Sequence, residues 1–249
     1  MHFAGIKLNP QHEALLLQLE NEVGQVEYGL GSQSESGFAG VSKAADNAYV
    51  ICITDQLQGE PLACSLAHQL LYALQIKAGF PLVEAADAKL PWQNVLSASI
   101  NRLVLDLKAT DEAMTLGFDH SFFFNQRYKE IKVFASTRAT GQPLDSFQSL
   151  WFAIDLALAL IFLSADKINF LLSMLKGRED EAVNVALQII NIIEKTGYAT
   201  PGRAFLAMAE ISTLLNSWSH CPIHYGDKVI SSAQQYQTEF SNLRSLILG

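Results

Sequence analysis

Charged residues are scarce in this sequence. Asp, Glu, Lys and Arg make up 17% of its 249 residues and hydrophobic residues make up 49%, whereas an average soluble protein has about 25% charged residues. Disordered chains are rich in charge and poor in hydrophobic residues, so the composition excludes a disordered protein. The length fits one large domain or two small ones and is sufficient for a sizeable core.

Basic residues are fewer than acidic ones. The chain has 17 Lys and Arg against 25 Asp and Glu, which gives a formal net charge of −8 at pH 7. Proteins that bind the phosphate backbone of nucleic acids usually carry a basic surface. The charge balance therefore argues against a nucleic-acid partner, and it gives no further indication of what the protein binds.

Cysteine is also rare. The sequence has 3 cysteines, Cys52, Cys64 and Cys221, and no two of them form a CxxC pair. Such cysteines are typical of packing residues in a reducing compartment. The N-terminal segment MHFAGIKLNPQHEALLLQLE lacks a basic stretch followed by a continuous apolar run, so we expect no signal peptide. Together these features predict a cytoplasmic protein.

Only one long hydrophobic run is present, LWFAIDLALALIFL at 150–163. It has about 14 residues, or roughly 21 Å as a helix, and the hydrocarbon core of a bilayer is ~30 Å thick. A lipid-facing helix would also tolerate Asp155 badly. We therefore expect no membrane partner, and a helix buried in a core or at a subunit interface. For Asp155 we predict an Arg or Lys partner, or a place lining a central cavity.

The spacing of hydrophobic residues predicts a protein that contains both helices and strands, with an excess of helix. Within this broad α/β class we expect the helix-rich α+β type. The run 49–53 is rich in β-branched residues, as expected of a buried strand. Strands are expected at 26–30, 38–43 and 48–54. Helices are expected at 10–23, 59–78, 91–107 (with a shorter one ending near 115), 147–162, 168–176, 179–195, 201–218 and 227–246.

We expect one domain over residues 1–249, with a change of character near residue 140. Residues 1–140 should combine a small mixed or antiparallel sheet with helices, and residues 141–249 should be entirely helical. The sequence shows no internal repeat and no low-complexity linker between these two regions. For this reason we predict one continuous core.

The second predicted helix reads ACSLAHQLLYALQIKAGFP. In zinc metallopeptidases the motif HExxH places two histidines four residues apart on one helical face, where both bind Zn²⁺, and its Glu acts as general base. The corresponding residues here are His68, Gln69, Leu70, Leu71 and Tyr72. The spacing of the motif is therefore present, with HQLLY in place of HELLH.

The surrounding segments resemble a bacterial group of zincin-like, HExxH-type metallopeptidases over roughly residues 45–120. That group has an edge strand, an HELLH-type helix, Gly-Phe-Pro, and an Asn-containing helix that ends in Leu-Gly-Phe/Tyr-Asp. This chain has the predicted strand at 49–54, Gly79-Phe80-Pro81, Asn101 and Leu116-Gly117-Phe118-Asp119. The resemblance implies a zincin-type helix packed on the small sheet, and a zinc peptidase ancestry.

The chain departs from that group at the residues that carry the chemistry. His68 is retained, but Gln69 cannot take a proton near neutral pH, and the phenol of Tyr72 is a poor zinc ligand. The resemblance implies a third ligand in the next helix, where only Asp106 can coordinate. One His and one Asp fall short of the three protein ligands usual in catalytic zinc sites.

Three interpretations follow. The favoured one is a non-catalytic zincin-like protein, with remnant positions His68, Gln69 and Tyr72 and no cofactor, that binds a protein partner or itself as a dimer. The second is a metal-dependent hydrolase in which His68 and Asp106 recruit His120 as a third ligand for zinc. In the third, the motif arises by chance and the chain is a helical interaction or immunity-type module.

Other histidine and serine patterns carry weaker signals. His220 and His224 in HCPIH are separated by Pro222, so they cannot share a helical face, and we expect an exposed loop. Ser32 and Ser34 lie in GLGSQSESG, which matches neither GxSxG nor GxGxxG and is typical of a Gly/Ser-rich hairpin loop.

The run 122–124 consists of three phenylalanines in a segment with polar flanks. We expect a loop there whose rings pack in the core. The alternative is an exposed anchor for a partner.

Overall fold

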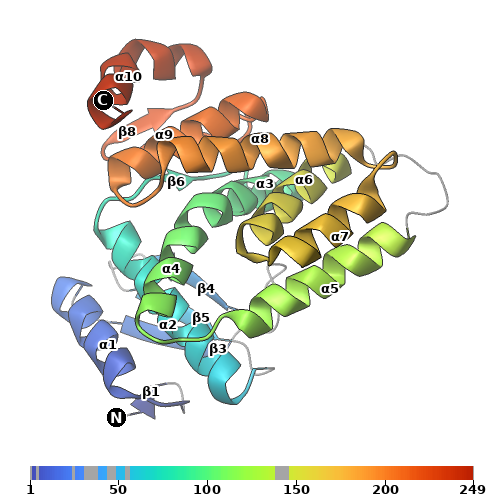
Figure 1. Cartoon of the computed structure of the whole chain (residues 1–249). Coiled ribbons are helices and arrows are strands. Elements are labelled where there is room, and N and C mark those ends of the chain that lie inside the picture. Colours follow the sequence, from blue (N-terminus) through green and yellow to red (C-terminus); the bar gives the residue numbers. More distant parts are fainter. Residues whose placement is uncertain are drawn as a thin grey trace. The chain divides into compact units, whose positions relative to one another are not determined.

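The computed structural model describes residues 2–3, 6–23, 26–30, 39–43, 49–53, 57–137 and 146–248 (Figure 1). The chain forms two compact units, and each is assembled from two separate stretches of sequence. The first contains 1–79 and 105–122, and the second contains 80–104 and 123–249. The predicted single domain with a change near residue 140 stays a prediction, and the two units divide the chain at other places.

The first unit combines a small mixed sheet with helices. Strand β5 lies between β3, which is parallel to it, and β4, which is antiparallel. Helix α2 packs against β4 and β5 and also against α1 and α4 (Figure 1). The elements are β1 (His2–Phe3), β2 (Ile6–Lys7), α1 (Pro10–Val23), β3 (Val26–Leu30), β4 (Ala39–Lys43), β5 (Tyr49–Ile53), α2 (Gly59–Lys77) and α4 (Leu107–Thr115).

Helix α2 contains the HQLLY sequence (68–72), and the residues at its two ends explain where it starts and stops. Pro61 in the first turn has the backbone angle that a helix start requires. Gly79 follows the last turn with a φ of 80°, a left-handed conformation that other residues adopt at a cost. Between these ends Cys64, Leu66 and Ala67 are fully buried. The predicted helix at 59–78 is therefore confirmed to within one residue.

The helical stretch from 91 to 115 contains a π-helical turn. Helix α3 (Pro91–Asn101) leads into η1 (Arg102–Asp106), which leads directly into α4. A π turn widens the helix by one residue and often occurs at functional sites. It shifts the face presented by the residues that follow, and Asp106 is the last residue of the turn.

The second unit is mostly helical. Helix α8 packs against both α6 and α9, and α9 packs against α10 (Figure 1). Its elements are β6 (Leu82–Val83), α3, most of α5 (Ser121–Thr137), α6 (Ser146–Phe162), α7 (Ala165–Leu175), α8 (Asp180–Thr196), α9 (Pro201–Leu214), β7 (Ile223–Tyr225), β8 (Lys228–Ile230) and α10 (Ala233–Leu248). The predicted helix-rich α+β class is confirmed.

The hydrophobic run of the sequence forms most of α6. Ala153, Ile154, Leu156 and Ala157 are completely inaccessible to solvent, so this helix is buried as predicted. Within the described part of the chain, no helix combines the length and the apolar character needed to cross a membrane.

One segment of the predicted helical half is not helical. Strands β7 and β8 form an antiparallel hairpin in which Tyr225 pairs with Lys228, and β6 pairs with β7 on the other side. Gly226 has a φ of 63° and provides the tight two-residue turn. The β-branched residues on either side of this turn favour strands. Helix α10 therefore begins only after the hairpin, at Ala233, and the expected helix start at 227 is wrong.

Candidate functional site

His68 and Asp106 come together in the first unit, as the sequence predicted. The Nε2 atom of His68 on α2 lies 3.6 Å from Oδ1 of Asp106 at the end of η1. Its other ring nitrogen, Nδ1, lies 3.5 Å from the hydroxyl of Thr110 on α4. The His68 side chain is 13% exposed and that of Asp106 is 29% exposed. Both ring nitrogens of His68 therefore face oxygen atoms of the protein.

Tyr72 lies one helical turn after His68, on the same face of α2. Burial and then the nearby negative charge of Asp106 raise the pKa of its phenol above the ordinary value near 10. The hydroxyl consequently stays protonated at neutral pH. Gln69, which replaces the glutamate of the motif, is half-buried, and its amide cannot act as a base.

His120 lies in the loop between α4 and α5, and only 4% of it is exposed. Its ring centroid is 5.7 Å from that of His68. Its Nδ1 atom is 3.1 Å from the Cys64 sulfur and 3.4 Å from the Phe118 carbonyl oxygen. Burial and then the charge of His68 lower the pKa of His120 to about 4, so its imidazole is neutral under ordinary conditions.

Cys64 completes this cluster and was not a predicted site residue. It lies four residues before His68 on the same face of α2 and is fully buried. Burial and then the acidic residues Asp119 and Glu60 raise the pKa of its thiol to about 12. A group in this state is a poor nucleophile because the reactive form is the thiolate. The C-x₃-H spacing of Cys64 and His68 is the sequence signal that could have identified it.

The candidate metal ligands form two pairs of contacts. His68 faces Asp106, whereas His120 faces Cys64. Among the described residues, no three His, Cys, Asp or Glu side chains converge to hold a metal ion. Tyr72 takes the place where the resemblance implies a second histidine. In this arrangement His68, Asp106 and His120 do not fit a catalytic zinc ion, which needs three ligands around one point.

Two predictions fall in the second unit, and the structure bears out the first and part of the second. Arg127 on α5 forms an ion pair with Asp155 on α6, so the predicted arginine or lysine partner is confirmed. Burial raises the pKa of Asp155, and the charge of Arg102 opposes this effect. His220 is exposed and its ring packs edge-on against Trp92, as a residue outside regular structure. His224 lies on strand β7, is half-buried and is 3.3 Å from a Glu84 carboxylate oxygen, so the expected exposed loop is wrong for His224.

The predicted loop at 122–124 is wrong, because α5 begins at Ser121. The Asp119 carboxylate accepts hydrogen bonds from the backbone N–H and the hydroxyl of Ser121, and so starts the helix. Phe124 stacks on Phe162 with ring centroids 4.5 Å apart but is only half-buried, like Phe123, and Phe122 is 43% exposed. The expectation that the three rings pack in the core is therefore wrong for Phe122. Ser32 and Ser34 lie outside the described residues.

Comparisons with known proteins identify no relative. No protein-family model, no curated protein and no solved structure matches this chain.

Proposed function

We propose that this chain is a non-catalytic zincin-like protein that acts by binding. The observation that carries the proposal is the state of Tyr72. A protonated phenol, held beside the Asp106 carboxylate, stands where a zinc peptidase needs a neutral imidazole. Gln69 next to it removes the general base as well. The resemblance supplies the zincin-like part of the proposal.

The contacts of His68 support the same conclusion. A histidine that binds zinc uses one ring nitrogen for the metal and the other for a partner that orients the ring. Here Nδ1 faces Thr110 and Nε2 faces Asp106. Asp106 could share a metal ion with Nε2, but among the described residues no third His, Cys, Asp or Glu side chain joins them.

Exposed hydrophobic residues in the first unit support a role in binding a protein. Around the end of α4, Met114 is 49% exposed, Leu116 is 38% exposed, and the nearby Phe122 is 43% exposed. These three residues lie close together in the sequence, and exposed apolar side chains in contiguous patches are typical of interaction sites. The partner is a protein or a second copy of this chain.

Metal analysis of protein purified without a histidine tag tests the proposal. We expect less than stoichiometric zinc, and the same amount in the His68→Ala variant. Stoichiometric zinc that is lost on His68→Ala would contradict the proposal. It would instead favour a metal-dependent hydrolase with His68, Asp106 and His120 as rearranged ligands.

A further inference from the structure

The sheet β6-β7-β8 has two outer edges, and a side-chain amide closes the first of them. The Asn101 amide nitrogen donates to the Val83 carbonyl at 2.8 Å, and its amide oxygen accepts from the Val83 N–H at 2.8 Å. An antiparallel neighbouring strand would bind these two groups of Val83 in the same way. Asn101, on α3, thus takes the place of one residue of a fourth strand on β6.

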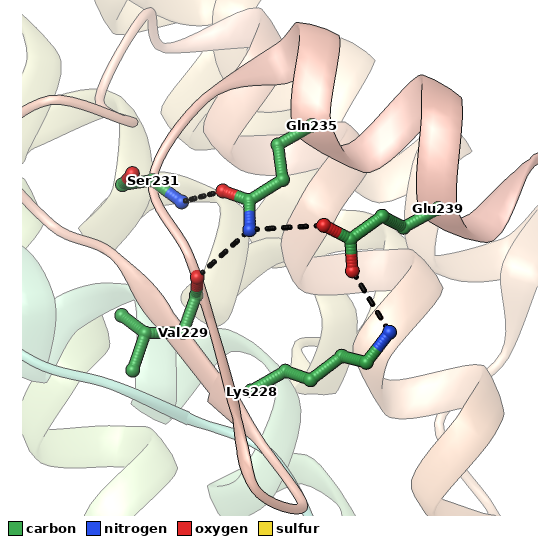
Figure 2. A network of polar contacts seen from close by, with 5 residues as sticks. All are labelled: Lys228, Val229, Ser231, Gln235 and Glu239. Atoms are coloured by element: carbon green, nitrogen blue, oxygen red, sulfur yellow. Dashed lines mark hydrogen bonds and ion pairs between the residues drawn. The ribbon is translucent and has the colours of Figure 1, made fainter.

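Gln235, on α10, closes the edge of β8. Its amide nitrogen donates to the Val229 carbonyl at 3.1 Å, and its amide oxygen accepts from the Ser231 N–H at 3.1 Å (Figure 2). These groups lie two residues apart on the side of β8 away from β7. One residue of a parallel strand would bind the same pair of groups.

A small network holds the Gln235 side chain in place. Its amide nitrogen also donates to the Glu239 carboxylate at 3.2 Å, and Lys228 donates to the other oxygen of that carboxylate at 2.8 Å (Figure 2). All these contacts are exposed to solvent. The closure of the β8 edge therefore depends on a few exposed contacts, whereas the two Asn101 contacts are partly buried.

We propose that Asn101 and Gln235 act as strand substitutes, and that Gln235 keeps β8 from pairing with β8 of a second copy of this chain. An unpaired edge is a template for strand addition. Two copies of β8 paired antiparallel form a symmetric contact that closes on itself as a dimer. Val229 supports this occupant because it is a hydrophobic residue, 48% exposed, at the covered edge.

The Gln235→Ala variant tests the proposal, and Gln234→Ala is the matched control on the exposed side of the same helix. For Gln235→Ala we expect the Ser231 amide to exchange hydrogen about tenfold faster in dilute protein, because it loses its hydrogen bond. We also expect the mass from light scattering to rise with concentration toward twice that of the unchanged protein. The Gln234→Ala variant should match the unchanged protein in both measurements.

Adding Val229→Lys to Gln235→Ala should restore the original mass, because an edge lysine opposes strand pairing. A folded Gln235→Ala variant with unchanged mass at all concentrations would overturn the proposal. So would an increased mass that Val229→Lys leaves in place, because the copies would then associate elsewhere. If Gln235→Ala fails to fold, Gln235→Glu serves instead, since its carboxylate cannot donate to Val229.

Discussion

The phenol of Tyr72 lies one helical turn after His68 and near the carboxylate of Asp106. At the scale of single residues, this side chain and Gln69 are what distinguish the chain, in our proposal, from a working zinc peptidase. The phenol is protonated and the amide is not a base, so neither contributes to metal-dependent hydrolysis. His68, Asp106 and Thr110 form a polar cluster that links α2 to η1 and α4.

If Tyr72 is only a packing residue, its ring matters more than its hydroxyl. We expect Tyr72→Phe to change the free energy of unfolding by less than about 1 kcal/mol. Tyr72→Ala should cost more, roughly 2–3 kcal/mol, because it removes a half-buried ring. Chemical denaturation of both variants measures the difference. A large loss in Tyr72→Phe would show that the hydroxyl makes an essential contact.

His120 predicts how stability depends on pH. Burial and the charge of His68 lower its pKa to about 4, whereas an unfolded histidine has a pKa near 6.5. Between these values only the unfolded chain binds the proton, so acid favours unfolding. The His120 contribution should fall by roughly 3 kcal/mol from pH 6.5 to pH 4 and stay constant above pH 6.5.

Denaturation curves across this pH range test the prediction, with His120→Gln as the control. The variant should show a smaller loss of stability in acid than the unchanged protein. A remaining slope of the same sign is expected from His12, whose pKa is also lowered by burial. Equal slopes in the two proteins would contradict a buried, neutral His120.

At the scale of helices and strands, the sequence predicted correctly those elements whose ends are marked by particular residues, such as proline or glycine. Pro10, Pro61 and Gly79 mark helix ends through backbone angles that each residue favours, and the structure has ends at these places. The π turn at η1 could not be predicted, because it is a shift in backbone hydrogen bonding without a residue type of its own. The hairpin of β7 and β8 was missed because its strands have only 3 residues each.

Gly226 should be the residue on which that hairpin depends. It has a φ of 63°, and a Cβ added there would meet nothing within 4 Å, so the cost of a side chain is purely conformational. We expect Gly226→Ala to destabilise the protein by roughly 1–2 kcal/mol. Asp227, the second residue of the turn, does not have a positive φ, so the turn is of the type that requires glycine first, and Gly226→Asn should cost about as much as Gly226→Ala. Thermal denaturation of both variants measures the two losses, and an unchanged stability in either variant would count against this explanation.

At the scale of the whole molecule, the sequence predicted which residues belong to the site better than it predicted how they are arranged in space. His68, Asp106 and His120 were predicted from the motif and its surroundings. Their distances depend on how segments more than 30 residues apart meet in the first unit, which no local pattern encodes. Thr110 was missed for the same reason, whereas the C-x₃-H spacing could have indicated Cys64. The low proportion of charged residues in the sequence is explained in part by helix α6, whose hydrophobic side chains are buried.

We propose that the chain keeps a zincin-like fold around α2 but has lost zinc binding and catalysis. Restoring the HELLH sequence tests this proposal most directly. The double variant Gln69→Glu/Tyr72→His brings back the HELLH sequence beside Asp106, and zinc binding to the tag-free protein is measured by calorimetry. We expect about one zinc per chain in the double variant, none in the unchanged protein, and loss of binding when His68→Ala is added. A folded double variant that binds no zinc would contradict the zincin-like frame.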